Sequence, residues 1–228
     1  MKNGIDDGVI KYDRSNFTQC EALNYSEYAE LETWRTLLYR LNLIGEYPEE
    51  KVGFGNMSKA IDYNDYAPFD GTQFVITGTQ TGKYPKLNGE HYTRVLGYDI
   101  ARQKITVLGP LEASSEALTH AAIYEANSNI KAIFHIHSKP IWDGMKNDSA
   151  PSTHEDIPYG TLEMANAVKD LIGNQKQGVI CMRGHEDGVI AYAETTEAAG
   201  DLILELYFNY VEKKVRPVYQ NLSNEAHL

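Results

Sequence analysis

Residues 114–138 have the sequence SSEALTHAAIYEANSNIKAIFHIHS, in which a helical pattern is followed by a strand pattern. Leu118 and Ala122 recur at helical spacing, so residues 114–127 are predicted to form a helix. The apolar-rich run at 131–137 predicts a strand. Because only a short turn separates the two elements, we expect them to pack antiparallel. The start of the helix would then lie beside the end of the strand.

The rest of the chain contains further segments of both kinds. Several predicted strands follow one another as hairpins, which does not fit a doubly wound parallel sheet. The pattern indicates an α/β protein of three layers, whose central mostly antiparallel or mixed sheet carries helices on both faces. Further helices are predicted at 26–43, 160–173 and 195–214, and further strands at 73–78, 93–100, 104–109, 178–184 and 187–194.

Length and composition favour one domain. The chain has 228 residues, of which 42% are hydrophobic and 23% are charged, as in ordinary globular proteins. No repeat, low-complexity tract or linker divides the sequence. We therefore expect a loosely ordered N-terminal segment at 1–25, a single domain at 26–216 and a C-terminal tail at 217–228.

The charge balance excludes several kinds of partner. With 21 basic and 32 acidic residues the net charge is −11, and no basic cluster interrupts it, which argues against nucleic acid and anionic membranes. The apolar runs are far shorter than the ~20 residues that cross a bilayer. No secretory signal is visible, and two cysteines without a motif suit a reducing compartment, so we expect a cytoplasmic protein. An anionic substrate would need a metal ion, a helix N-terminus or a group of backbone amides.

Four residues are candidates for one metal site. His135 and His137 stand at positions i and i+2 of a predicted strand, so both imidazoles project to the same face and can bind one cation. Glu116 opens the preceding helix, and antiparallel packing places its carboxylate beside them. His185, in the turn sequence RGHEDGV at 183–189, would complete a set of three histidines and one carboxylate.

Each of these residues also has an ordinary explanation. Two histidines can alternate on a strand by chance, and a lone loop histidine is usually structural. An acid in the first turn of a helix often only complements the helix dipole. His120, four residues after Glu116 on the same face of the predicted helix, is interpreted as a structural residue that could support the site.

Five short motifs, in a fixed order, carry a resemblance to a known family. They are GNMS (55–58), ITGTQTG (76–82), SSEALTH (114–120), HIHS (135–138) and GHEDGVIAY (184–192). His135 follows Glu116 by 19 residues, as the family pattern requires. Over residues 28–212 the sequence resembles the class II aldolase/adducin family, whose members include sugar-phosphate aldolases, epimerases and dehydratases.

The resemblance implies a cofactor and the residues that hold it. The cofactor is a divalent metal ion, usually zinc, with manganese, iron and cobalt as alternatives. Its implied ligands are His135, His137 and His185. Glu116 matches the acidic position that can ligate the metal and move protons as the catalytic residue.

The resemblance also implies a substrate and a reaction. Hydroxyl and amide groups of five residues would hold the phosphate of the substrate. Such groups can bind an anion even where no lysine is present. The implied reaction is that of an aldolase-type lyase, which cleaves or forms a C–C bond of a small phosphorylated sugar through a metal-stabilised enediolate. A dehydratase or epimerase with the same metal site, and a non-catalytic adducin-like interaction module, are the alternatives. A homotetramer with sites near its interfaces is implied as well. The phosphate-binding residues would be Asn56, Thr81, Gly82, Ser114 and Ser115.

Two segments depart from the family pattern. Glu186 and Asp187 stand between His185 and the glycine that usually follows this histidine at once, and their acidic side chains could alter the ligand geometry.

The second departure is the short loop at 139–159. Sugar-phosphate aldolases and epimerases of the family generally have a longer stretch here, with a Tyr or Asp that reaches into the site of a neighbouring subunit. Glu155 and Asp156 are the catalytic candidates there, and His154 and Tyr159 are further candidates. The alternative is that each is a solvated loop side chain.

Overall fold

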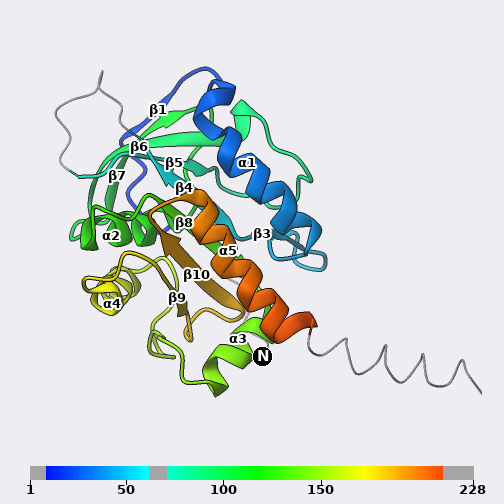
Figure 1. Ribbon diagram of the computed structural model, residues 1–228. Coiled ribbons are helices and arrows are strands. Elements are labelled where there is room, and N and C mark those ends of the chain that lie inside the picture. The colour runs from blue at the N-terminus through cyan, green and yellow to red at the C-terminus, as the bar shows by residue number, and fades with distance from the viewer. Residues whose placement is uncertain (1–8, 62–70, 213–228) are drawn as a thin grey trace, which may run out of the picture.

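The computed structural model describes residues 9–61 and 71–212, and a sheet of eight strands forms its centre (Figure 1). The strand order is β1-β7-β6-β5-β4-β8-β10-β9, and a separate two-stranded sheet pairs β2 with β3. Neighbouring strands of the large sheet are antiparallel except β1 and β7, which are parallel. The predicted α/β class with a mixed sheet is confirmed.

The strands are β1 (Phe17–Gln19), β2 (Gly45–Tyr47), β3 (Val52–Phe54), β4 (Asn56–Ala60), β5 (Phe74–Thr77), β6 (Tyr92–Asp99), β7 (Lys104–Gly109), β8 (Ala132–His137), β9 (Gly178–Cys181) and β10 (Gly188–Ala193). The helices are α1 (Tyr25–Arg40), the short 3₁₀ helix η2 (Gly89–His91), α2 (Ala117–Ala126), α3 (Lys139–Asn147), α4 (Leu162–Ile172), α5 (Thr196–Tyr207) and the π-helical turn η3 (Phe208–Glu212).

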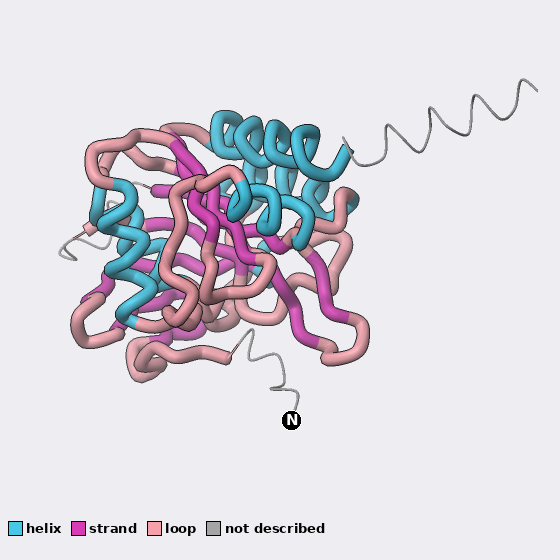
Figure 2. The backbone as a smooth tube through the Cα atoms, turned by 90° about the horizontal axis from the view of Figure 1, so that it is seen from below, coloured by secondary structure: helices cyan, strands magenta, loops and turns pink. Residues whose placement is uncertain are grey.

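Helices cover both faces of the large sheet, and each face has its own apolar core. Side chains of α1, α3 and α5 pack on one face, and those of α2 and α4 pack on the other (Figure 1). In Figure 2 the strands run between the helices. Within the described residues, no helix is long and apolar enough to span a bilayer.

Strand β8 lies near the middle of the sheet, so both of its faces are covered and all six of its residues are buried. Phe134 and Ile136 join the core beneath α1, α3 and α5, whereas Ile133 joins the core beneath α2 and α4. Successive side chains of a strand alternate between faces. This alternation directs His135 and His137 toward the side of α2, which positions the site.

Some elements are not predicted by the sequence patterns. Strand β4 begins within the turn-rich stretch at 53–58 and pairs with β5 and β8. The expected loop after His137 contains α3, and the hairpin β2–β3 has no counterpart among the predicted strands.

Residues 9–25, which belong to the expected N-terminal segment at 1–25, are among the described residues. Within it β1 pairs with β7, and the buried Tyr12 donates a hydrogen bond of 2.8 Å to the carbonyl of Ala113. Residues 1–8 and the proposed tail at 217–228 lie outside the described residues, so the domain boundaries stay predictions.

Candidate metal centre

His135 and His137 lie side by side on β8, as the alternation of a strand requires. Their Nε2 atoms are 3.0 Å apart, and both side chains are buried. His135 is placed opposite Asn56 of β4 and Ile190 of β10, because β8 pairs with both strands. The sheet on both sides therefore fixes where the two rings point.

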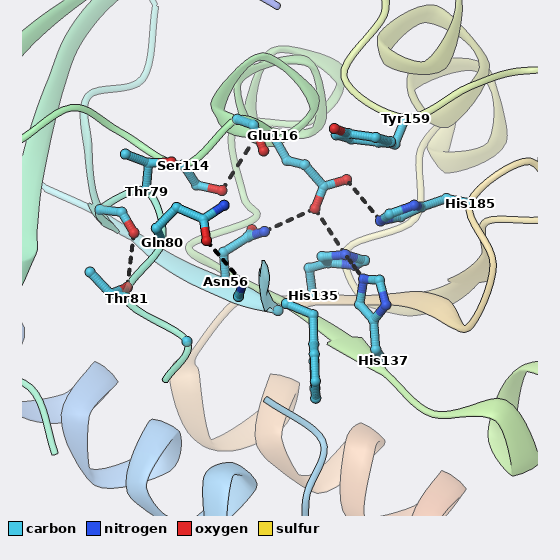
Figure 3. A pocket seen from close by; sticks show the side chains of 16 residues that line it. Asn56, Thr79, Gln80, Thr81, Ser114, Glu116, His135, His137, Tyr159 and His185 are labelled. Atoms are coloured by element: carbon cyan, nitrogen blue, oxygen red, sulfur yellow. Dashed lines mark hydrogen bonds and ion pairs between the residues drawn. The ribbon is translucent and has the colours of Figure 1, made fainter. Parts of the chain in front are cut away.

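Glu116 stands at the start of α2 and reaches the histidines, as expected from antiparallel packing of the helix and the strand. Its Oε2 lies 2.8 Å from Nε2 of His135 and accepts a hydrogen bond of 2.8 Å from Nδ2 of Asn56 (Figure 3). The carboxylate is 3% exposed, so it is shielded from bulk water. The sequence-predicted pairing of this helix start with the strand end is present in the structure.

His185 arrives from the turn between β9 and β10 and completes the cluster. Its ring centroid is 5.3 Å from that of His135 and 4.6 Å from that of His137. Ligand atoms of the three histidines all lie within 4.8 Å of one another. A Cβ on Gly188 would come within 2.7 Å of the His185 ring, so this glycine lets β10 pass close beneath the cluster.

The two acids that follow His185 do not enter the site. Glu186 is exposed, and the backbone carbonyl of Asp187 accepts a hydrogen bond of 2.9 Å from the amide of Ser138. Asp187 has a positive φ of 65°, which closes the turn toward Gly188. The two extra residues therefore form a tight turn that leaves His185 facing the other histidines.

Burial and neighbouring charges set the protonation of the cluster. Desolvation lowers the pKa of His185 to about 4 and the pKa of His137 well below its usual value, so both imidazoles are neutral at pH 7. Burial alone would raise the pKa of Glu116, but His135, His185 and the Asn56 amide outweigh it and hold that pKa far below the ordinary value. The site thus offers the neutral imidazoles of His137 and His185 and an ionised carboxylate.

This donor set fits a divalent ion. Neutral imidazole nitrogens and a carboxylate are ligands of zinc and of related transition metals. Oε1 of Glu116 is buried and has no hydrogen-bond partner among the described residues, although Nε2 of His185 lies 3.8 Å from it. A buried carboxylate oxygen without a partner is costly, and a cation between the rings would relieve that cost.

All five residues predicted to bind phosphate line the same pocket as the histidines. They come from three of the sequence motifs and are Asn56, Thr81, Gly82, Ser114 and Ser115. Ser114 and Ser115 directly precede helix α2, and Oγ of Ser114 accepts a hydrogen bond of 3.4 Å from the amide of Glu116 (Figure 3). The pocket therefore joins the metal ligands to groups that can bind an anion.

Two further residues support this pocket. Arg35 of α1 is 1% exposed and donates hydrogen bonds of 3.3 and 3.0 Å to the carbonyls of Thr81 and Gly82, which fixes the loop behind the pocket. Tyr159 lines the pocket and stacks on His185 with centroids 4.7 Å apart. Tyr159 is among the loop candidates from the sequence, but Arg35 gives no sequence signal, since its partners are 46 and 47 residues away.

Glu155 and Asp156, the acid/base candidates of the loop, lie outside the pocket. Both side chains are exposed, Glu155 pairs with Arg183 at 3.4 Å, and Asp156 pairs with His154 at 3.4 Å. Neither lines the site of the histidines. A catalytic role for either residue stays a prediction that no contact in the described chain supports.

His120 lies in a buried hydrogen-bonded group with Ser58 and Tyr124, one helical turn after Glu116. Its Nδ1 is 2.7 Å from Oγ of Ser58, which in turn lies 2.8 Å from the hydroxyl of Tyr124. The His120 ring is fully buried, and this desolvation lowers its pKa to about 3. The ring is therefore neutral in the folded protein at neutral and mildly acidic pH.

The buried neutral His120 predicts a pH dependence of stability for the metal-free protein. Below about pH 6.5 the unfolded chain protonates this histidine and the folded chain does not, so the free energy of unfolding falls as the pH falls. Between pH 7 and pH 5 this residue should remove about 2 kcal/mol, at ~1.4 kcal/mol per pH unit. Urea denaturation at the two pH values should show that the loss is smaller by this amount in His120→Asn, which keeps an amide near Ser58. An equal loss in both proteins would contradict the assignment.

Comparison with known proteins agrees with the geometry. The model of the class II aldolase and adducin N-terminal domain family matches residues 42–209. Among curated proteins, no sequence matches the chain. Because the family match spans most of the described chain, it includes every residue of the candidate metal cluster.

Solved structures of similar fold have low sequence identity to the chain. A sugar-phosphate aldolase from Thermotoga maritima has 18% identity and a TM-score of 0.60, with 87% of this chain and 95% of that chain covered. An L-fuculose-1-phosphate aldolase from Thermus thermophilus has 19% identity and a TM-score of 0.58, with 89% and 98% covered. These structures show the fold, and with the family match they lead to one conclusion: the chain belongs to the class II aldolase and adducin family.

Proposed function

We propose that the protein is a metal-dependent lyase that cleaves or forms a C–C bond of a small phosphorylated sugar. One observation carries the proposal: three buried histidines and Glu116 share a pocket with the start of α2 and the hydroxyls of Ser114 and Ser115. Metal ligands, an ionised carboxylate and anion-binding groups are the parts that such a reaction needs.

The proposed cofactor is a zinc ion. His135, His137 and His185 would hold it, and Glu116 would complete the ligand set when no substrate is present. A bound zinc ion supplies a Lewis acid that stabilises negative charge developing on a substrate oxygen.

The proposed phosphate site compensates for the negative charge of the chain. The start of α2 carries part of the positive end of the helix dipole, and Ser114 and Ser115, which directly precede it, line the pocket. Thr81 and Gly82 line the same pocket, and their carbonyls face Arg35, so that the loop is held from behind. A chain with a net charge of −11 can in this way bind an anion without lysine in the pocket.

Glu116 is the proposed proton carrier. Its Oε2 is held by Asn56 and His135, which fixes the carboxylate, while Oε1 lies at the pocket without a hydrogen-bond partner among the described residues. An ionised carboxylate in this position can take a proton from the substrate carbon next to the carbonyl and return it. Asn56 and the sheet beneath it orient the group for this task.

The same site would serve a dehydratase or an epimerase, since both reactions also begin next to a carbonyl. A non-catalytic adducin-like module is less well supported, because such a module has no need for three imidazoles buried around an ionised carboxylate. The products of the reaction therefore distinguish the candidates.

The proposal is tested by incubating the zinc-loaded protein with a panel of ketose and aldose phosphates. We expect release of an aldehyde together with dihydroxyacetone phosphate or glycolaldehyde phosphate, measured by NMR, and no release by His137→Ala. Loss of water or a changed stereocentre without cleavage would show a dehydratase or an epimerase instead. If the zinc-loaded protein changes none of these sugars, the proposed enzymatic function is wrong.

We also propose that the protein forms a homotetramer, as the family resemblance implies. Light scattering of the purified chain should give four times the mass of one chain, and a monomeric mass at micromolar concentration would contradict this assembly.

A further inference from the structure

Tyr47 contacts the back of one proposed metal ligand. Its hydroxyl lies 2.7 Å from Nδ1 of His137, while Nε2 of that ring faces His135 at 3.0 Å. Tyr47 ends β2 in the small two-stranded sheet and does not line the pocket of the histidines. The tyrosine therefore touches the ring on the side away from the cluster.

The two neighbouring histidines have partners of different kinds. Nδ1 of His135 lies 3.1 Å from the carbonyl oxygen of Val189, and a carbonyl can only accept, so this nitrogen carries the proton. A tyrosine hydroxyl can donate or accept. The partner of His137 thus permits the proton of that ring on either nitrogen, whereas the partner of His135 Nδ1 requires a proton on that nitrogen.

A bound ion would remove this freedom. Nε2 of His137 is the nitrogen that faces the cluster, so it must offer its lone pair to the ion and leave the proton on Nδ1. Nδ1–H then donates a hydrogen bond to the oxygen of the Tyr47 hydroxyl. We propose that Tyr47 is a positioning residue that orients His137 and accepts the hydrogen bond from its Nδ1–H when a divalent ion binds, an inference that rests on the proposed metal site.

The hydroxyl of Tyr47 can be removed by substitution while the packing of its ring is kept. Tyr47 lies against Phe54 with ring centroids 4.6 Å apart, and Phe54 lies 5.5 Å from the His137 ring. These contacts belong to the rings and remain in Tyr47→Phe. The substitution therefore removes one hydrogen bond to His137 and leaves Nδ1–H without this acceptor in a half-buried place.

The test is the zinc affinity of the metal-stripped protein, measured by competition with a chromophoric chelator. Tyr47→Phe should weaken zinc binding by about 10- to 100-fold, as loss of a hydrogen-bond partner of a metal-bound histidine does in other proteins. The matched control is Tyr210→Phe, which removes an equally short 2.7 Å hydrogen bond, to Asp148 on the surface. This control should bind zinc as the unchanged protein does.

The possible results separate the inference from the function on which it rests. If the unchanged protein takes up no zinc, the proposed metal site is wrong. If it binds zinc and Tyr47→Phe binds equally tightly, only the role of Tyr47 is wrong.

A second measurement needs no variant. Long-range ¹H–¹⁵N spectra of the zinc-loaded protein should show the proton of His137 on Nδ1 and zinc on Nε2. The opposite arrangement would overturn the inference.

Discussion

Replacing His185 by alanine is expected to lower zinc affinity by more than about 100-fold. This loss is larger than the loss of about 10- to 100-fold that follows removal of the hydrogen-bond partner of a metal-bound histidine. His185 supplies one of the three imidazoles whose ligand atoms lie within 4.8 Å of one another in the described chain. Two imidazoles and one carboxylate would leave the ion open to water and weakly held. The ring also stacks on Tyr159, so the substitution leaves a gap there.

The measurement is zinc content after equilibrium dialysis, with affinity from chelator competition. The matched control is His154→Ala, an exposed histidine of the loop whose ring pairs only weakly with Asp156 at 3.4 Å. We expect one zinc per chain in the unchanged protein and in His154→Ala, and little zinc in His185→Ala. Undiminished binding by His185→Ala would show that this ring is not a ligand.

Replacing Glu116 by glutamine should separate the reaction from metal binding. Glutamine keeps an oxygen that can accept the 2.8 Å hydrogen bond from Asn56, and all three imidazoles remain. It cannot take a proton, and its side chain carries no charge. We therefore expect kcat to fall by about 10²- to 10⁴-fold, the usual contribution of a positioned acid or base, while zinc remains bound with reduced affinity.

The measurement is the rate of aldehyde release from the best substrate of the sugar-phosphate panel. Glu155→Gln is the matched control, because this exposed carboxylate pairs with Arg183 and lies outside the pocket. It should keep the kcat of the unchanged protein. If Glu116→Gln retains full kcat, another group moves the proton. A fall in Glu155→Gln instead would assign that role to the loop.

Local periodicity is enough to predict the core of this site. The alternation of His135 and His137 on a strand, and the helix that returns from Glu116, are short-range features of the chain. The position of His185 follows from its place between two predicted strands, and the structure has it there. What periodicity cannot give is the separation between this turn and the other histidines, which only the sheet order sets.

The elements that the sequence patterns do not predict depend on contacts between distant parts of the chain. Strands β2 and β3 have three residues each, pair with one another and contact His137, so no sequence pattern of their own marks them. Helix α3 does have a signal, since Ser138 precedes a proline in the first turn and Ile141, Trp142 and Met145 are buried on one side. This helical pattern is short, and it lies in the segment 139–159, which the family resemblance indicates to be a loop.

The acid/base candidates of the loop show a different limit. Exposed acids and catalytic acids have the same residue types, and only the fold decides which of them face a pocket. Glu155 turns toward Arg183, 28 residues away, and not toward the histidines. Tyr159, four residues later, is instead buried against His185.

The most direct test of the metal centre is zinc K-edge X-ray absorption of the protein loaded with one equivalent of zinc. Three imidazole nitrogens from His135, His137 and His185, at about 2.0–2.1 Å, are predicted for the unchanged protein, and two for His185→Ala loaded with excess zinc. A spectrum with fewer than three imidazoles in the unchanged protein, or one that His185→Ala leaves as it was, would contradict the metal centre on which the proposed function depends.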